Sequence, residues 1–279
     1  MASWSALCAA SLVVACPLLA RALAAPARDF DVVRAASGGR GPRVALIGGN
    51  PGVARFYEKF ARNLAASIDG DVAVVGLRGF LDGRRASLAW WFDAAAWCVG
   101  FERGCFSVDE QIEHARVCLA DEAAACEREG RELVVVAHSI GGYFSLKALG
   151  AGRSTYACLV SPYLENNEGD AKFRGLRGAV CHPLAPVLVV AAAACAGLLG
   201  LLPKFVRRAA LRAAGQTDGM DSVHENVAVE SMCAFSTAFT MAALGRSEMR
   251  RLATPYDGLS LRGNQLLGQV RTRRILKPQ

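Results

Sequence analysis

The sequence predicts an α/β fold built on a parallel sheet with helices on both faces. Short apolar runs occur without polar interruption, as expected of strands that are buried on both faces. Amphipathic stretches at helical spacing separate these runs, and turn residues such as the GGNPG segment at 48–52 bound them. This alternation favours strands at 43–47, 71–77, 133–137 and 156–160.

Helices are predicted at 54–68, 108–127 and 140–149. The first carries apolar residues on one helical face, namely Phe56, Phe60, Leu64 and Ile68. Because crossovers between parallel strands are right-handed, the carboxyl ends of all four strands should meet at one edge of the sheet, where ligands bind. The loop at 48–52 and Ser139 both fall at that edge.

Ser139 stands where the apolar run 133–137 changes into a helical pattern. A sharp strand-to-helix turn projects a serine above the sheet and exposes its hydroxyl as a nucleophile. Such a turn needs small neighbours, and Ala137 and Gly141 lie two residues to either side of Ser139, although the pattern is AxSxG rather than GxSxG. The simpler alternative is a serine that caps a helix. His138 and His114 are expected to be structural.

Backbone amides near Ser139 could stabilise a developing oxyanion. The amide of Ile140 lies at the start of the predicted helix. A second donor is expected from Gly49 or Asn50, because the glycines at 48–49 let the backbone approach a substrate closely. Neither a metal nor an organic cofactor is implied.

At this point the chain resembles the lipid-droplet-associated hydrolases. The matching blocks are LIGGNPG at 46–52 with Phe56, Tyr57 and Phe60, QIEH at 111–114, AHSIGGY at 137–143, and ESMC at 230–233 through Glu248 and Met249. The likeness runs from about residue 42 to 250. It implies an α/β-hydrolase-like fold with a helical cap insertion, a serine hydrolase architecture, and residence on the endoplasmic reticulum and lipid droplets. Lipid esters, and sterol esters among them, are the implied substrates.

The partners that Ser139 would need are hard to find. After Ser139 the chain has only His182 and His224, and neither follows a late strand, where a hydrolase carries its acid and histidine. The family's acid and histidine would lie beyond residue 250, where this sequence has no histidine and Asp257 as its only acid. A chain that ends at Gln279 would therefore be expected to have little or no activity.

Residues 183–202 form an apolar run, PLAPVLVVAAAACAGLLGLL, that contains no charged residue. Twenty helical residues would extend roughly 30 Å. Basic residues flank the run at both ends, which favours a hairpin or shallow helix with both ends in the cytosol over an oriented span. Contact with a membrane or droplet and a lid over the active site both remain open. Those flanking residues are Arg174, Arg177, Lys204, Arg207, Arg208 and Arg212.

Composition restricts the class of protein. The chain is 53% hydrophobic with a mean hydropathy of +0.25, high for a soluble enzyme. Residues 246–279 hold eight basic and two acidic residues, hence +6 of the net +7, so the body is nearly neutral and no nucleic-acid partner is expected. The ten cysteines form no metal-binding or disulfide pattern and are expected to be reduced on the cytosolic side.

Four regions are predicted: an apolar, Ala-rich extension at 1–41, which is either a targeting segment or packed on the domain; a core at 42–165; a cap at 166–245; and a basic tail at 246–279. Within the tail, residues 254–279 lack an apolar run long enough for a central strand and are expected to be a mobile extension. The principal interpretation is a serine hydrolase of lipid esters on the cytosolic face of droplets or the endoplasmic reticulum. Two alternatives are a droplet-associated protein that keeps the fold without a catalytic triad, and a soluble hydrolase of small esters.

Overall fold

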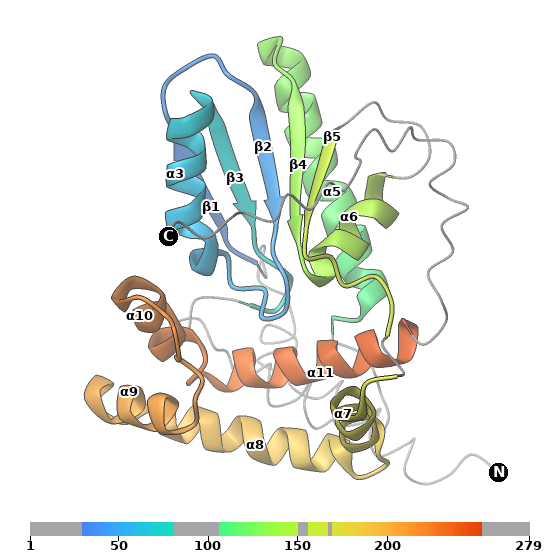
Figure 1. The fold of residues 1–279 in the computed structure, drawn as a ribbon, viewed down its shortest axis with the longest axis vertical. Coiled ribbons are helices and arrows are strands. Elements are labelled where there is room, and N and C mark those ends of the chain that lie inside the picture. The colour runs from blue at the N-terminus through green and yellow to red at the C-terminus, as the bar shows by residue number, and fades with distance from the viewer. Residues whose placement is uncertain (1–29, 81–105, 150–155, 167–168, 253–279) are drawn as a thin grey trace, which may run out of the picture.

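The computed structural model describes residues 30–80, 106–149, 156–166 and 169–252. Its strands form one sheet in the order β1-β3-β2-β4-β5 (Figure 1). β2 pairs in parallel with β3 and β4, and β4 in parallel with β5, which confirms the predicted parallel sheet. The strands are β1 (Val32–Ala36), β2 (Arg43–Ile47), β3 (Asp71–Val75), β4 (Leu133–His138) and β5 (Tyr156–Val160).

Helices cover both faces of this sheet (Figure 1). Alternate residues of β2 point to opposite sides: Val44 and Leu46 pack in the cluster of α3, whereas Ala45 and Ile47 pack in that of α5 and α6. This two-sided burial explains why the strands read as continuous apolar runs. The helical elements of the core are η1 (Ala54–Tyr57), α3 (Glu58–Ile68), α5 (Val108–Glu129) and α6 (Ile140–Leu149).

β1 was not expected from the sequence. It pairs antiparallel with β3 at the edge of the sheet, with Val32 opposite Val75. Arg34 interrupts its apolar residues, so β1 lacks the continuous apolar run of the central strands, and only Ala35 of its five residues is buried. The predicted extension at 1–41 therefore contributes a strand to the sheet, while residues 1–29 lie outside the described part.

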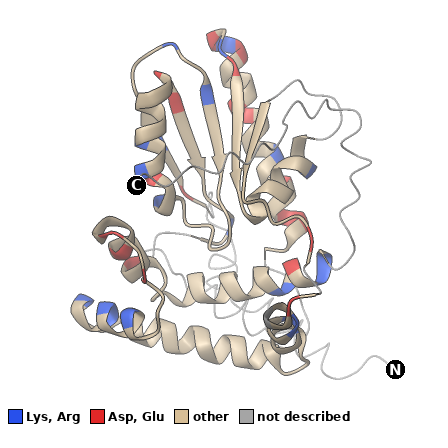
Figure 2. Ribbon diagram, in the orientation of Figure 1, with Lys and Arg blue, Asp and Glu red and all other residues tan. Residues whose placement is uncertain are grey.

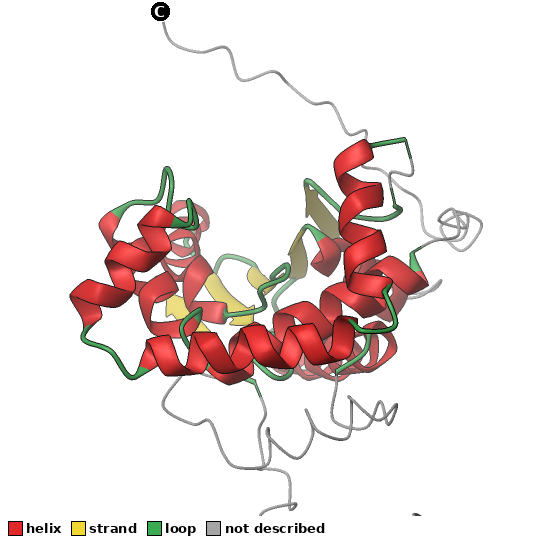
Figure 3. Ribbon diagram, turned by 90° about the horizontal axis from the view of Figure 1, so that it is seen from below, coloured by secondary structure: helices red, strands yellow, loops and turns green. Residues whose placement is uncertain are grey.

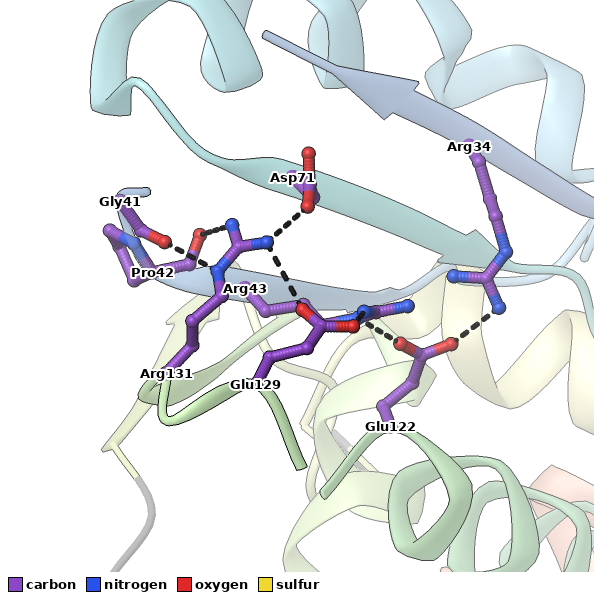
Figure 4. Close-up of polar contacts among 8 residues, drawn as sticks. All are labelled: Arg34, Gly41, Pro42, Arg43, Asp71, Glu122, Glu129 and Arg131. Atoms are coloured by element: carbon purple, nitrogen blue, oxygen red, sulfur yellow. Dashed lines mark hydrogen bonds and ion pairs between the residues drawn. The ribbon is translucent and has the colours of Figure 1, made fainter. Parts of the chain in front are cut away.

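A polar network joins the amino-terminal ends of the strands (Figure 4). Glu122 of α5 accepts hydrogen bonds from Arg34 and Arg43, each at 2.7 Å. Arg131, just before β4, donates to Asp71 at the start of β3. Because Glu122 is only 5% exposed, these bonds compensate the carboxylate for its lost hydration.

Five helices, which we call the cap, lie across the carboxyl ends of the strands (Figures 1 and 3). Arg55 of η1 pairs with Glu230 of α10 at 2.9 Å, and Lys59 of α3 pairs with Asp221, the N-cap of α10, at 2.5 Å. These ion pairs attach the cap to the core. The cap comprises α7 (Ala171–Cys181), α8 (Ala185–Gly200), α9 (Lys204–Ala213), α10 (Ser222–Ser231) and α11 (Phe235–Arg251).

Within the cap, α11 runs next to the strand ends and α8 packs on its far side (Figure 1). Ala193 of α8 is buried with Phe235, Phe239 and Ala243 of α11. The packing is close, since a Cβ on Gly200 would lie 2.1 Å from the carbonyl oxygen of Cys233. The predicted apolar run 183–202 thus contains one complete helix with one face covered by protein.

Among the described residues, no single helix has both the length and the apolar composition needed to cross a membrane. Two helix pairs meet these criteria only when taken together, with bends of 96° between 173–181 and α8 and of 92° between α10 and α11. The apolar N-terminal stretch at 7–20 and most of the basic tail, residues 253–279, lie outside the described residues. The predictions made for both remain predictions.

Candidate active site

Ser139 occupies the single residue between β4 and α6. Its φ of 53° places it in the left-handed region, which is costly for a non-glycine residue and persists only where the surroundings hold it. Three backbone hydrogen bonds hold Ser139 in this conformation. Its amide donates to the Val160 carbonyl at 3.1 Å, and its carbonyl accepts from the amides of Gly142 and Tyr163, each at 3.0 Å. The local structure is therefore the sharp strand-to-helix turn that the sequence predicts.

Two glycines let the loop after β2 pass directly against this turn. A Cβ on Gly141 would lie 2.3 Å from the carbonyl oxygen of Gly48, and a Cβ on Gly49 would lie 2.8 Å from the Cβ of Ser139. Both distances are shorter than any real Cβ contact, so only glycine fits at either position. The structure thus brings together the two segments that the sequence places at the same sheet edge.

The candidate amide donors differ in what they already bind. The amide of Ile140 is the first of α6, where helical amides lack an intrahelical acceptor. The Gly49 amide donates to the Tyr57 hydroxyl at 2.9 Å. For the Asn50 amide the described part of the chain provides no hydrogen-bond acceptor. Of the two predicted alternatives for the second donor, Asn50 is the one whose amide is not already committed.

Tyr57 links the glycine loop to the residue before Ser139. Its hydroxyl lies 2.9 Å from Nδ1 of His138 as well as from the Gly49 amide. The hydroxyl accepts from the Gly49 amide, and its contact with Nδ1 of His138 is a second hydrogen bond whose direction follows from the tautomer of the imidazole. Burial raises the pKa of Tyr57, although the bond from Gly49 opposes this, so the phenol keeps its proton at neutral pH. Tyr57 therefore holds the imidazole of His138 in place through this hydrogen bond.

The side chain of Asn50 reaches the cap. Its Nδ2 donates to the carbonyl of Met241 at 3.0 Å and to Oε1 of Glu248 at 3.3 Å, both on α11. Glu248 is only 8% exposed. Burial raises the pKa of its carboxyl to about 7, and the hydrogen bond from Asn50 opposes this rise. A titratable carboxyl in contact with a candidate substrate loop is a feature that recurs at functional sites.

The remaining histidines have partners elsewhere. Nδ1 of His182 accepts from the Leu184 amide at 3.1 Å in the turn before α8, and Nδ1 of His224 lies 2.7 Å from Asp221 at the start of α10. His114 is buried and bonds to the carbonyl of Gly76 at 2.9 Å, in agreement with its predicted structural role. In the described ranges no histidine hydrogen-bonds to Ser139. Asp257 lies outside these ranges.

Sequence reasoning did not identify Tyr57 or Glu248 as parts of this site. Both residues appear only inside blocks that carry the family resemblance, Tyr57 beside Phe56 and Glu248 beside Met249, with no role assigned to either. Neither residue belongs to a spacing pattern with Ser139. Their positions near Ser139 depend on how η1 and α11 pack at the sheet edge, and this packing cannot be predicted from local sequence patterns.

The comparisons with known proteins agree with this architecture. The family model described as "Lipid-droplet associated hydrolase" matches residues 40–267, which is more than half of the chain. A protein of Dictyostelium discoideum named "Lipid droplet-associated hydrolase" is 28% identical over 113 residues. That match covers 38% of this chain and 32% of the relative, so it spans about a third of the relative's length.

The solved structures to which this chain is similar include several hydrolytic enzymes. A probable hydrolytic enzyme from Pseudomonas aeruginosa is 17% identical, with 82% of this chain and 64% of that chain covered and a TM-score of 0.45. A monoacylglycerol lipase from Paleococcus ferrophilus is 17% identical, with 55% and 51% covered and a TM-score of 0.34. The family match confirms the resemblance read from the sequence: the chain belongs to the lipid-droplet-associated hydrolase family and has an α/β-hydrolase-like fold.

Proposed function

We propose that this chain is a serine hydrolase that acts on lipid esters at the surface of lipid droplets or the endoplasmic reticulum, with Ser139 as the nucleophile. The observation that carries the proposal is the left-handed Ser139 at the junction of β4 and α6, with the Gly49 backbone directly beside it. Membership of the lipid-droplet-associated hydrolase family supports both the reaction class and the droplet surface.

The proposed chemistry is acyl transfer through the serine. Ser139 Oγ loses its proton to a general base and attacks the ester carbonyl carbon, which becomes tetrahedral with a negative oxygen. The amides of Ile140 and Asn50 stabilise that oxygen, because the Gly49 amide is already bonded to Tyr57. Collapse of the intermediate breaks the bond between its central carbon and the alcohol oxygen, and the alcohol leaves with the proton that the base took from Ser139. Water then attacks the acyl-serine by the same route, which releases the fatty acid and restores the hydroxyl.

A second candidate function is a droplet-associated protein with this fold and no catalysis. The observation that favours it is the lack of a histidine partner for Ser139 among the described residues. Without a general base a serine hydroxyl is a weak nucleophile. The two functions make opposite predictions for turnover, so one assay separates them.

The outward face of α8 supports the lipid surface as partner. Its exposed positions are 187, 188, 191, 192, 195 and 198, a spacing that places them on one side of the helix, and every one is apolar. Leu188 is 63% exposed and Leu198 is 65% exposed, and Phe205 on α9 is 72% exposed. Basic residues of α9 lie at one end of this face, whereas α8 itself carries no charge (Figure 2). Exposed apolar side chains bounded by cations suit an interface with anionic headgroups.

The experiment measures ester turnover by the full chain on three substrates: an emulsified triacylglycerol, an emulsified sterol ester and a short soluble ester. Turnover of an emulsion that disappears in Ser139→Ala supports the proposal. The matched control is Ser161→Ala, because Ser161 directly follows β5 and also has a positive φ, of 44°. Turnover of the soluble ester alone would favour a small-ester hydrolase. No turnover of any substrate would favour the non-catalytic function.

A further inference from the structure

Glu248 differs from the other buried glutamates of the described residues in its hydrogen-bond partner, which is uncharged. Glu122 accepts hydrogen bonds from two arginines, and Glu225 in the cap accepts two from Arg212. Glu248, 8% exposed, has no cation in contact within the described ranges, and its hydrogen-bond partner is the neutral Asn50. Burying a carboxylate without a cation costs free energy of folding. Carboxyls in such surroundings occur often at functional sites, which makes Glu248 a candidate for a functional role.

The contact with Asn50 has a defined geometry. The amide group of Asn50 has two N–H donors, and these reach two acceptors seven residues apart on α11, the Met241 carbonyl and the Glu248 carboxyl. Two such bonds fix the plane of the amide, which leaves Oδ1 of Asn50 buried without a donor among the described residues. The side chain that anchors this segment therefore belongs to the same residue as the candidate oxyanion amide.

Gly49, the residue directly before Asn50, lies against Ser139. Gly49 lies so close to Ser139 that a Cβ would be 2.8 Å from the serine Cβ. A displacement of Asn50 along α11 would therefore change the position of its own amide relative to Ser139 Oγ. Oxyanion donors act only within a few tenths of an ångström of their acceptor position, so such a shift would lower the rate of attack.

We propose that Glu248 is a positioning residue for the candidate active site, which holds the Asn50 amide beside Ser139 through the Asn50 side chain and does so more strongly when its carboxyl is ionised. The proposal rests on the proposed serine-hydrolase function. A hydrogen bond to an ionised acceptor is stronger than one to a neutral acceptor. The cap helix α11 would thus control the order of the loop after β2.

The described residues that interact with Glu248 do not titrate near neutral pH. From the segment after β5, Tyr163 interacts with it, and burial together with the charge of Glu248 raises the pKa of Tyr163 to about 12. From the loop after β2 the facing group is Asn50, which does not titrate. Arg251 of α11 pairs with Asp109 of α5 at 3.5 Å. Because the pKa of Glu248 is raised to about 7, the Asn50 contact should strengthen as pH rises through that value.

The test measures the labelling rate of Ser139 by a fluorophosphonate from pH 5 to pH 9 in the full chain. We expect the wild-type rate to rise roughly fivefold to tenfold through pH 7, the difference between a neutral and a charge-assisted hydrogen bond. Glu248→Gln should flatten that rise. Glu225→Gln, which also neutralises a buried glutamate of the cap, should keep it. A rise that persists unchanged in Glu248→Gln would overturn the proposal and assign the titration to a different base.

A double-mutant cycle tests whether Glu248 acts through Asn50. Asn50→Ala removes the side-chain donors but keeps the main-chain amide. In that background Glu248→Gln should have no further effect on the pH profile, whereas two independent effects would contradict the proposed route.

Hydrogen exchange separates a failure of this proposal from a failure of the proposed function. Amides of the peptide 48–57, corrected for the intrinsic pH dependence, should gain protection through pH 7 in the wild type and not in Glu248→Gln. If Ser139 does not label at any pH, the serine-hydrolase function fails, and the exchange result alone then decides the positioning role. Equal protection in both proteins at every pH would overturn that role.

Discussion

Neutralising the carboxyl of Glu248 should stabilise the protein above neutral pH. Burial raises the pKa of this carboxyl from the ordinary 4.5 to about 7. In the unfolded chain the group ionises near pH 4.5, whereas in the folded chain it keeps its proton until about pH 7. Between these values the unfolded state binds fewer protons than the folded state, so the stability contributed by this group falls as pH rises.

The difference between about 7 and 4.5 corresponds, at 1.36 kcal/mol per pKa unit, to about 3 kcal/mol. Gln has nearly the shape of a protonated Glu and carries no charge at any pH. The free energy of unfolding of Glu248→Gln should therefore equal that of the wild type near pH 4. It should exceed the wild-type value by up to about 3 kcal/mol at pH 8.

Urea unfolding followed by far-ultraviolet circular dichroism, between pH 4 and pH 8, measures this difference. The control is Glu225→Gln, whose effect should have the opposite sign at pH 8, because the hydrogen bond from Arg212 lowers the pKa of Glu225. A Glu248→Gln variant that is no more stable than the wild type at pH 8 would refute the reasoning, since its carboxyl would then lie in a well-solvated or paired environment.

Three further predictions concern other parts of the molecule. Burial raises the pKa of Glu122, but its two arginine partners outweigh this and lower it, so Glu122→Gln should cost roughly 1–2 kcal/mol at pH 7. The cost should vanish in urea titrations as pH falls through the folded pKa. Gly141→Ala should destabilise by about 1–3 kcal/mol in thermal unfolding, because its Cβ would meet a carbonyl oxygen at 2.3 Å, whereas Gly178→Ala on α7, with open space around it, should be neutral or stabilising. Leu188→Gln with Leu198→Gln should weaken flotation with phospholipid-coated droplets roughly tenfold at an unchanged melting temperature, because both side chains are exposed; undiminished flotation would assign the droplet contact to another surface.

Much of the core follows from apolar patterns. The strands β2 and β5 have the predicted ends, and α6 begins directly after Ser139 as expected, because each lies in an uninterrupted apolar or helical pattern. The predicted helix at 54–68 instead begins with the short helix η1 before α3. β1 was not predicted, because Arg34 divides its apolar residues into two pairs that are too short to indicate a strand.

The site was predictable only where it depends on local sequence. Ser139 and Gly141 follow from the geometry of a tight strand-to-helix turn, which constrains residues within a few positions. The commitment of the Gly49 amide to Tyr57 depends on the orientation of η1, and it changes which of the two predicted amides is available. The contact between Asn50 and Glu248 joins residues 198 positions apart, so no local pattern could indicate it.

The central claim is that Ser139 is an activated nucleophile, and covalent labelling tests it most directly. The full chain is treated with a fluorophosphonate, digested, and analysed by mass spectrometry to locate the adduct. The account predicts one adduct, on the peptide that contains Ser139, which is absent from Ser139→Ala and present in Ser161→Ala. An adduct on another residue, or one that persists in Ser139→Ala, would contradict the assignment of the nucleophile. A folded wild-type protein that takes up no label would contradict catalysis by this chain and leave the non-catalytic function in its place.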